Sequence, residues 1–504
     1  MERPERAGLA IVSLLFLALS LPFTQRLGIE ADEAMIANGI YAHGAPLYSW
    51  RFAGYEIPVM LISYLGALKT WLYNPYFALW PPSPFSLRIP AVFAGIAGLW
   101  LFFALLDRVA SRPAAWIGTL LLATDSSFLL VESTDFGFVA LQFVLKLAAI
   151  LLLLKFHREG GMLALAGGFF CFGLALWDKA VFIWVLCGLV TATLVVAPRA
   201  FLRHLNWRNV AVATISLVLG ALPLLIYNFA RPLETLRANA KVGPERLAVK
   251  TNILSHTIDG SALFGFVTSV EPHSSNLPQR NLILPMLVAA VFFSLLIWWR
   301  KAGTPALFGL IACGVTWLLM AFTAGAGGAV QHTILLWPFH LLIVAVAIAQ
   351  LPLRWAGALT IVLCFSNLAV TCRYYSDLVR NGPAIRWTDA IDPLKQYLSA
   401  SKAQRILIAD WGVIETLSLL SEGKLPVYSA DVRDSETLNE MIANPDQIFV
   451  SHAAEFTFVP GIRSRLDEQA RNNGFKEEPI AVISDSHARP TFEIFGFRSS
   501  GEGK

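Results

Sequence analysis

The sequence is poor in charge. Lys, Arg, Asp and Glu make up 15% of its 504 residues, against about 25% in an average soluble domain, whereas hydrophobic residues make up 56%. This balance excludes a soluble globule of this size, and it equally excludes a disordered or fibrous chain. The net charge of +4 at pH 7 is too small to indicate binding to nucleic acid.

Cysteine is also scarce, with five residues that all lie in or beside apolar segments. No two of them have the spacing of metal ligands, so we interpret them as small core residues. Residues 373–504 contain no cysteine, no Gly-x-Ser-x-Gly motif and no zinc signature. These absences give no support to a hydrolase in that region.

The charged residues that do occur are unevenly distributed, because 34 of the 74 Lys, Arg, Asp and Glu residues lie in residues 373–504. Long apolar runs fill the rest of the chain, and a helix needs about 20 apolar residues to cross a bilayer. We therefore predict an α-helical polytopic membrane body, residues 1–372, followed by a soluble domain, residues 373–504. About eleven segments qualify as spans by this length rule: 8–26, 87–106, 114–132, 137–156, 162–177, 180–197, 209–229, 281–299, 304–323, 333–350 and 355–372.

The basic residues of the short loops predict the orientation in an inner (plasma) membrane. Lys and Arg concentrate on the cytoplasmic side, and a cytoplasmic N-terminus places Arg108, Arg112, Lys155 and Arg158 there. The same parity predicts two long external loops, 27–86 and 230–280, and an extracytoplasmic C-terminal domain.

Two further segments carry structural predictions. Residues 57–73 are apolar enough to cross the membrane. A crossing there would place every later loop on the opposite side and turn the basic clusters outward, so we expect an interfacial helix. The C-terminal domain alternates helical stretches with β-rich runs, which predicts a small α/β domain. The predicted strands are 405–410, 426–430, 447–452, 480–484 and 491–497.

Ionisable residues at the ends of membrane spans are costly and tend to be functional. By parity, those on the external side meet at one membrane face, where acidic turns beside basic side chains predict a site for a phosphorylated substrate lying in the bilayer. The candidates are Asp32, Glu33, Glu132, Asp135, Asp178 and Lys179 in turns and loop starts, Arg231, Arg237, Lys241, His256, Glu271 and His273 in the second external loop, and Gln331 and His332 before a span.

Simpler interpretations stay open for each of these residues. Asp32 is equally well explained as a helix cap, and the acids of the tight turns as solvated turn residues. Arg51 and Arg88 are alternatively interfacial anchors, and His332 and His340 packing residues. His256, Glu271 and His273 have weak metal-site spacing, and a surface loop is the better interpretation.

The order of these motifs over about residues 23–350 resembles the C-type (GT-C) polytopic glycosyltransferases, in particular the protein O-mannosyltransferase and aminoarabinose-transferase branch. Two positions depart from the pattern of that family. The Arg that usually precedes the second acid is Glu132 or Ser133 here, and an Arg-Tyr pair is replaced by Gln331 and His332. The matching motifs are Asp32–Glu33 after the first span, Arg88–Ile89–Pro90, Ala123–Thr124, Asp135–Phe136–Gly137 and Lys179.

The resemblance implies a GT-C-like fold and inverting transfer of a sugar from a polyprenyl-phosphate donor to a hydroxyl of a lipid, polysaccharide or protein acceptor. Some relatives use a divalent metal, for which the sequence offers no convincing ligand set. The implied roles are general base for Asp32, orientation of Asp32 for Glu33, acceptor positioning or support of Lys179 for Asp135, donor phosphate binding for Lys179, Arg88 and His332, and substrate binding for Glu132, Asp178, Arg51 and His256.

A non-catalytic alternative is a lipid-linked sugar translocase or a subunit for cell-envelope assembly. A translocase needs polar residues deep within its spans to form a route across the membrane. Apart from Gln142, Lys146 and Asn367, the mid-span positions are mostly apolar. Polar residues gathered at one face favour an enzyme.

Overall fold

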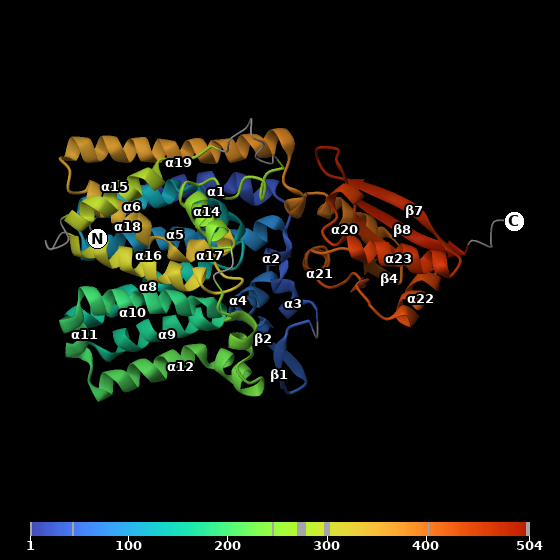
Figure 1. Ribbon diagram of the computed structural model, residues 1–504, viewed down its shortest axis with the longest axis horizontal. Coiled ribbons are helices and arrows are strands. Elements are labelled where there is room, and N and C mark those ends of the chain that lie inside the picture. The colour runs from blue at the N-terminus through green and yellow to red at the C-terminus, as the bar shows by residue number, and fades with distance from the viewer. Residues whose placement is uncertain are drawn as a thin grey trace.

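The computed structural model describes residues 3–42, 45–243, 246–269, 279–296, 303–401 and 403–499. A body of roughly parallel and antiparallel helices carries a smaller α/β domain at one end, and the N-terminus lies at the opposite end of the body (Figure 1). That the N-terminus and the C-terminal domain lie on opposite sides of a membrane stays a prediction.

The helices of the body confirm an integral membrane protein. Among the described residues, six are long and apolar enough to cross a bilayer: α1 (Arg3–Arg26), α5 (Pro84–Val109), α8 (Ala140–Glu159), α12 (Trp207–Ala230), α16 (Thr304–Ala321) and α19 (Leu353–Asn381). The number rises to nine if each of three bent helix pairs counts as one span. The first pair is α6 (Arg112–Thr124) with α7 (Ser126–Thr134), and the second is η1 (Ala180–Phe182) and α10 (Ile183–Val196) with α11 (Pro198–His204). The third is α17 (Val330–Thr333) and η3 (Ile334–Leu336) with α18 (Phe339–Ile348).

The two remaining predicted spans contain shorter apolar helices among the described residues. Helix α9 (Met162–Asp178) has 17 residues, and α15 (Ile283–Leu296) has 14 residues up to the point where the described residues end. Each of the eleven predicted segments therefore contains a helix, while six to nine of them qualify as spans.

The bend between α6 and α7 has a clear chemical cause. Asp125 adopts an extended backbone between the two helices, and its side chain accepts a hydrogen bond of 2.7 Å from the Phe128 N–H. An aspartate in this position is a helix N-cap, so one helix ends and another begins inside an apolar run. The two axes differ by 60°, and α7 carries Glu132 and leads into Asp135.

The segment 27–86, which is predicted to be external, corrects the prediction of a helix over residues 57–73. It forms a small antiparallel sheet of β1 (Tyr48–Phe52), β2 (Tyr55–Ile62) and β3 (Leu65–Gly66), and a helix begins only at α4 (Leu68–Phe77). The hairpin turn at Ala53 and Gly54 has positive φ at both residues, as tight two-residue hairpins require, and this turn commits the following apolar residues to a strand.

The described part of segment 230–280, which is also predicted to be external, contains α13 (Glu234–Asn239) and α14 (Leu247–Ile258). Glu271 and His273 of the predicted loop lie outside the described residues. The last helix of the body continues past the expected boundary at residue 372 and ends at Asn381, because Tyr374 is still buried and stacks on Phe264 with 3.8 Å between ring centroids. Gly382, with φ of 78°, ends the helix.

The C-terminal domain is a five-stranded mixed sheet with helices, as the sequence predicts. The strand order is β5-β4-β6-β8-β7, in which β4 pairs with β5 and β6 in parallel, and β8 pairs with β6 and β7 antiparallel. Its elements are η4 (Ile385–Trp387), α20 (Ile391–Ala400), β4 (Arg405–Ile408), α21 (Ile414–Leu420), β5 (Val427–Ser429), α22 (Ser435–Ala443), β6 (Gln447–His452), η5 (Ala454–Phe456), α23 (Pro460–Asn472), β7 (Phe475–Ser484) and β8 (Pro490–Ser499).

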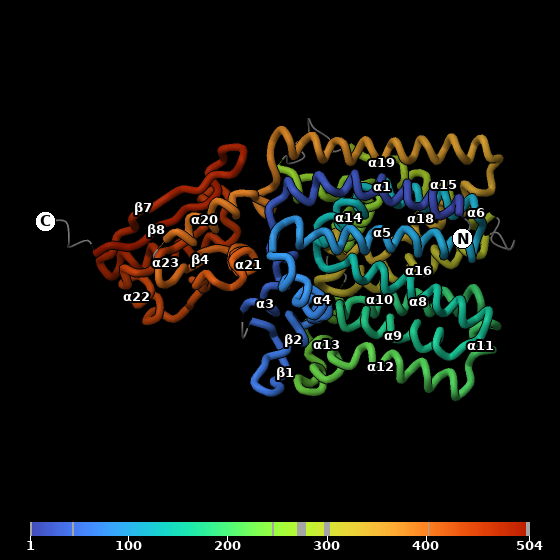
Figure 2. The backbone as a smooth tube through the Cα atoms, turned by 180° about the vertical axis from the view of Figure 1, so that it is seen from behind, coloured from blue at the N-terminus to red at the C-terminus, as the bar shows by residue number. Residues whose placement is uncertain are grey.

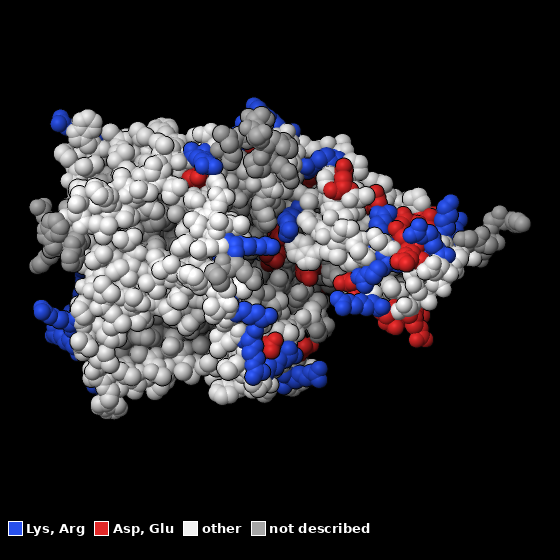
Figure 3. Space-filling model, in the orientation of Figure 1, with Lys and Arg blue, Asp and Glu red and all other residues white. Residues whose placement is uncertain are grey.

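The chain after the first helix lies between the two parts of the molecule. Helices α2 (Ala31–Ala34) and α3 (Ile36–Ile40) pack against α21, and both tube and ribbon views place them between the helical body and the C-terminal domain (Figures 1 and 2). Lys, Arg, Asp and Glu gather at this end and over the domain, whereas the sides of the body show almost none in the view of Figure 3.

Candidate active site

The candidate site lies at the end of the helical body that faces the C-terminal domain, and α2 is its first element. Glu30 caps this helix, because its Oε2 accepts a 2.6 Å hydrogen bond from the Asp32 N–H. Glu33 completes a capping box by accepting a 3.1 Å bond from the Glu30 N–H. This short, doubly capped helix fixes where Asp32 and Glu33 point.

Glu33 and Arg88 form a closed pair inside the protein. Both side chains are fully buried, and the Arg88 Nε and Nη2 donate to the two oxygens of the Glu33 carboxylate. The other guanidinium N–H groups donate to the carbonyls of Thr24, Leu27 and Gly28 at 2.6–3.0 Å. A guanidinium has five N–H donors, so Arg88 has none left for the donor phosphate that the resemblance assigns to it.

The carboxylate of Asp135 also has partners on both of its oxygens. It adopts the left-handed conformation after α7, with φ of 47°, and its Oδ1 accepts 3.1 Å hydrogen bonds from the N–H groups of Val139 and Ala140. Its Oδ2 lies 2.5 Å from the Nζ of Lys69 on α4, and both side chains are buried. The interfacial helix predicted over residues 57–73 would place Lys69 at the level of the lipid headgroups, whereas in the structure its side chain is buried against this acid.

Lys179 occupies the turn between α9 and η1. A bridge to Leu65 of β3 and a 2.8 Å bond from the Ala180 N–H to the Tyr64 carbonyl hold this turn against the first external loop. The buried Nζ donates one hydrogen bond, 2.6 Å long, to the Gly137 carbonyl. Burial lowers the pKa of Lys179 to about 8, although the charges of nearby acids, Asp32 among them, oppose that shift.

Among the described residues, nothing bonds the buried Glu132 Oε2 or the buried Asp178 Oδ1. Asp32 differs from both acids because its side chain is partly exposed. Within the described part of the chain no residue donates a hydrogen bond to its carboxylate. Burial raises the pKa of Asp32, and the positive charges of Lys179 and Arg386 partly offset this effect. A half-buried carboxylate with a raised pKa, beside two cations and without a fixed partner, can accept a proton from a substrate.

Arg386 was not anticipated from the sequence. It belongs to η4 in the segment that links the body to the C-terminal domain, and its Nη1 lies 3.9 Å from the Glu30 Oε1. The link is held at Gly28, whose N–H donates a 2.8 Å bond to the Trp387 carbonyl. The sequence shows Arg386 only as a lone basic residue between Pro383 and Trp387, which does not reveal that its guanidinium lies near Glu30.

The other predicted site residues divide into two groups. Asp178 is buried beside Lys179 and its Oδ2 accepts a 2.9 Å bond from Gln142, while Glu132 is buried in α7. His332 lies on α17 and is half-buried.

Two residues are not brought to the cluster. Arg51 is exposed in β1 opposite Glu56, and His256 bonds Ser261 at 2.9 Å within its own segment. No group of three or more His, Cys, Asp or Glu among the described residues could hold a metal ion.

Comparison with known proteins supplies a fold. No protein-family model matches this sequence, and no curated protein matches it by sequence. Two solved structures of ArnT from Cupriavidus metallidurans, an aminoarabinose transferase with the GT-C fold, are similar over nearly the whole length of both chains. The apo form covers 97% of this chain and 98% of its own, with a TM-score of 0.62 and 12% identity.

The form bound to undecaprenyl phosphate covers 98% of each chain, with a TM-score of 0.59 and 12% identity. Similarity at this level establishes that the chain has the GT-C fold, which confirms the fold that the motif order implies.

Proposed function

We propose that this protein is a membrane glycosyltransferase that moves a hexosyl or pentosyl group from a polyprenyl-phosphate donor to an acceptor hydroxyl on the extracytoplasmic face, with inversion. The observation that carries the proposal is the partly exposed carboxylate of Asp32, whose charged form is favoured by the charges of Lys179 and Arg386, in a chain with the fold of ArnT. The ArnT structure with undecaprenyl phosphate supports a lipid-phosphate donor.

Asp32 acts as the general base. Its carboxylate takes the proton of the acceptor hydroxyl while that oxygen forms a bond to the anomeric carbon of the donor sugar. The bond from the anomeric carbon to the phosphate oxygen breaks at the same time, and the polyprenyl phosphate leaves with the electron pair. A positioned base of this kind contributes about 10²–10⁴-fold to the rate.

Lys179 stabilises the leaving phosphate. It uses one of its three N–H donors on the Gly137 carbonyl, so two remain for phosphate oxygens as their negative charge grows. The buried surroundings make this interaction stronger than it would be in water. His332 would lie on the same side of the donor phosphate as Lys179, and Asp178 beside Lys179 helps to keep that lysine charged.

Glu33, Arg88, Asp135 and Lys69 position the reacting groups. The Glu33–Arg88 pair anchors α2, and therefore Asp32, to the end of α1 and to α5. The Asp135–Lys69 pair joins the end of α7 to α4. We propose that these two buried pairs hold Asp32 and Lys179 at a constant separation while the substrates bind.

The test is Asp32→Asn in membrane vesicles supplied with radiolabelled undecaprenyl-phosphate sugars. Asn keeps the shape of the side chain and removes the base, so we expect sugar transfer to fall by at least about 10²-fold. Asp446→Asn, in an exposed turn of the C-terminal domain, is the matched control and retains activity. Full transfer by Asp32→Asn would remove Asp32 from catalysis, and a defect confined to the sidedness of the lipid-linked sugar would identify a translocase.

A further inference from the structure

Basic residues gather at the end of the helical body that lies away from the C-terminal domain. In the view of Figure 3, the charged side chains at that end are those of Lys and Arg. Ribbon and tube views both place α11 there, where α8 ends and α12 begins (Figures 1 and 2). Five exposed residues form what we call the basic patch: Lys155 and Arg158 near the end of α8, Arg199 and Arg203 of α11, and Arg208 at the start of α12.

Helix α11 lies across the ends of its neighbours. It is bent by 106° from α10, and none of its residues is buried. The His204 Nε2 lies 3.0 Å from the His157 Nδ1, and the His204 ring lies 4.9 Å from that of Phe156, so α11 is attached to the end of α8. Asn206 then caps α12 by accepting a 3.0 Å bond from the Asn209 N–H. Because the spans α8 and α12 end and begin here, α11 lies at the level of the lipid headgroups.

The arginines of the basic patch have no acidic partner among the described residues. Arg112, at the same end of the body, pairs with both Glu5 and Asp107. No described acid forms such a pair with an arginine of the patch, and the patch's single ion pair in the described ranges joins Lys155 to Glu159 across 4.0 Å, with both side chains well exposed. The patch therefore carries an uncompensated positive charge.

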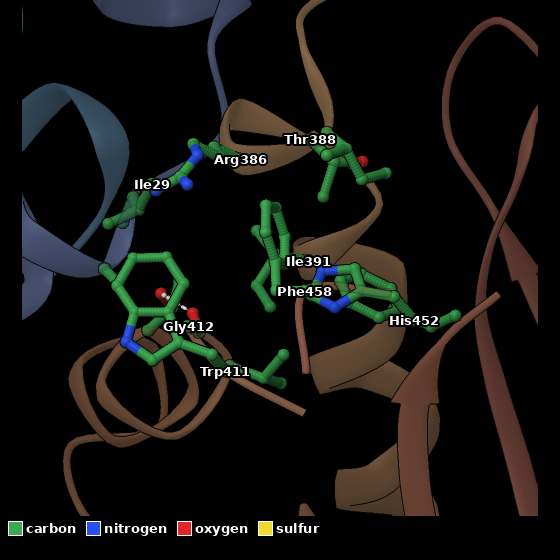
Figure 4. A pocket seen from close by; sticks show the side chains of 13 residues that line it. Ile29, Arg386, Thr388, Ile391, Trp411, Gly412, His452 and Phe458 are labelled. Carbon is green, nitrogen blue, oxygen red and sulfur yellow. Dashed lines mark hydrogen bonds between the residues drawn. The ribbon is translucent and has the colours of Figure 1, made fainter. Parts of the chain in front are cut away.

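Arg386, at the other end of the body, shows the contrasting arrangement. Its guanidinium lies 5.1 Å from the centre of the Trp411 ring and 4.8 Å from that of the Phe458 ring (Figure 4), so its charge has aromatic faces as partners. Arg199 and Arg203 instead stand one turn apart on α11, a helix without any acid. Like charges at this spacing destabilise a helix, so an anion from outside the chain would stabilise this one.

Exposed apolar side chains lie between these cations. Leu202, Leu205 and Trp207 are 64%, 52% and 84% exposed, and they alternate along the chain with the arginines of α11 and of the start of α12. A soluble anion would neutralise the arginines and leave these side chains in water. The glycerol backbone and acyl chains of a phospholipid would cover them, as they cover the apolar face of an interfacial helix. Tryptophan is also enriched at this level of a membrane.

We infer that the basic patch binds anionic phospholipids, with the headgroup phosphate on the guanidinium groups of α11 and Arg208 and the acyl chains beside Trp207. A guanidinium can hold a phosphate through two parallel N–H donors. A zwitterionic headgroup would bring an ammonium group to the same cations, so a lipid with a net negative charge binds more tightly. The patch lies at the end of the body away from the candidate active site, so this inference does not rest on the proposed function.

Native mass spectrometry of the full chain in a neutral detergent tests this inference. The probes are dioleoylphosphatidylglycerol and dioleoylphosphatidylcholine, which have the same acyl chains and differ in headgroup charge. We expect the wild-type chain to bind phosphatidylglycerol more tightly. Each basic residue near an anionic lipid contributes roughly fivefold to binding, so Arg199→Gln with Arg203→Gln should weaken phosphatidylglycerol binding by roughly 25-fold and change phosphatidylcholine binding by less than about twofold. Since α11 has no buried residue, the double variant should unfold at the same temperature as the wild type.

The controls separate this patch from positive charge in general. Arg354→Gln, at an exposed arginine at the start of α19 and outside the basic patch, should bind both lipids like the wild type. Arg199→Lys with Arg203→Lys keeps the charge and should retain most of the affinity for phosphatidylglycerol. Equal binding of the two lipids by the wild type, unchanged phosphatidylglycerol binding by the double glutamine variant, or an equal loss in Arg354→Gln would each overturn the inference. Displacement of phosphatidylglycerol by inorganic phosphate at constant ionic strength would also overturn it and identify a site for a soluble anion.

Discussion

Removing the carboxylate of Glu33 should destabilise the protein far more than its size predicts. Glu33→Ala would leave the Arg88 guanidinium, which is fully buried, with only the carbonyls of Thr24, Leu27 and Gly28 as partners. Breaking a buried ion pair by removing one partner costs about 3–5 kcal/mol, because an uncompensated charge stays in a medium of low polarity. We expect a loss of unfolding free energy in this range.

The assay is reversible unfolding of the purified chain in mixed micelles with a rising fraction of dodecyl sulfate. Glu422→Ala is the control, since Glu422 pairs with Lys424 at 3.2 Å on the surface, where both side chains are well exposed. A surface pair of this kind contributes about 0–1 kcal/mol.

A double variant separates charge from packing. Glu33→Leu with Arg88→Met removes both charges and retains apolar volume, so it should be less destabilised than Glu33→Ala. A Glu33→Ala cost similar to that of Glu422→Ala, or a double variant that loses as much as the two single variants added together, would refute the idea that an unpaired buried charge causes the loss.

Three further predictions follow from the same cluster. The transfer rate should fall as the pH drops through the raised pKa of Asp32, because the base is then protonated, and fall again above about pH 8, where Lys179 loses its charge; Lys179→Arg should remove the alkaline fall in a profile of kcat/KM against pH. Burial, with a smaller effect of the nearby charge of Asp32, raises the pKa of Glu30 from 4.5 to about 8. The folded state therefore holds this proton more tightly than the unfolded state, and stability is lost as the pH rises through about 8. Thermal unfolding at about pH 5 and about pH 9 should show a smaller difference in stability for Glu30→Gln than for the wild type. Gly28→Ala would place a Cβ 1.9 Å from the Thr388 carbonyl oxygen, so it should displace the linking segment and make it more sensitive to limited trypsin digestion.

Hydropathy and residue pattern predicted the helical body and the C-terminal α/β domain, because these features depend on the average composition of long stretches of the chain. The eleven apolar runs predicted as spans became helices, whereas the first part of the apolar run 57–73 became strand, and the β-rich runs of residues 373–504 became the strands of one sheet. Local capping chemistry was a weaker signal. Asp125, followed by two serines, is a recognisable N-cap inside an apolar run, and reading it as such would have predicted the bend between α6 and α7.

The choice of charge partners was beyond sequence reasoning. Arg88 and Glu33 are 55 residues apart, and nothing in the order of residues shows that the guanidinium turns to Glu33 and not to a lipid phosphate. Lys69 lies in an apolar segment, where a lysine usually extends to the headgroups. The hairpin ahead of it instead places its Nζ on Asp135, a contact that depends on the path of the whole loop.

The division between paired and open charges at this site is itself an argument about function. Glu33 with Arg88 and Asp135 with Lys69 are closed pairs, and each closed charge can position a neighbour but cannot exchange a proton or bind phosphate without breaking its pair. Asp32 is a partly exposed acid to which no described residue donates a hydrogen bond, Lys179 uses one of its three donors, and the charge of each favours the charged form of the other. A site built only for stability would gain from pairing Asp32 as well, since an open acid that is partly buried costs free energy. Active sites retain such unpaired groups because the reaction uses them.

The variant Asp32→Asn tests this argument. If its unfolding free energy rose while sugar transfer fell, the two effects together would show that the open carboxylate serves the reaction at the expense of stability. An Asp32→Asn variant that was less stable and fully active would show that the carboxylate serves stability and not the reaction.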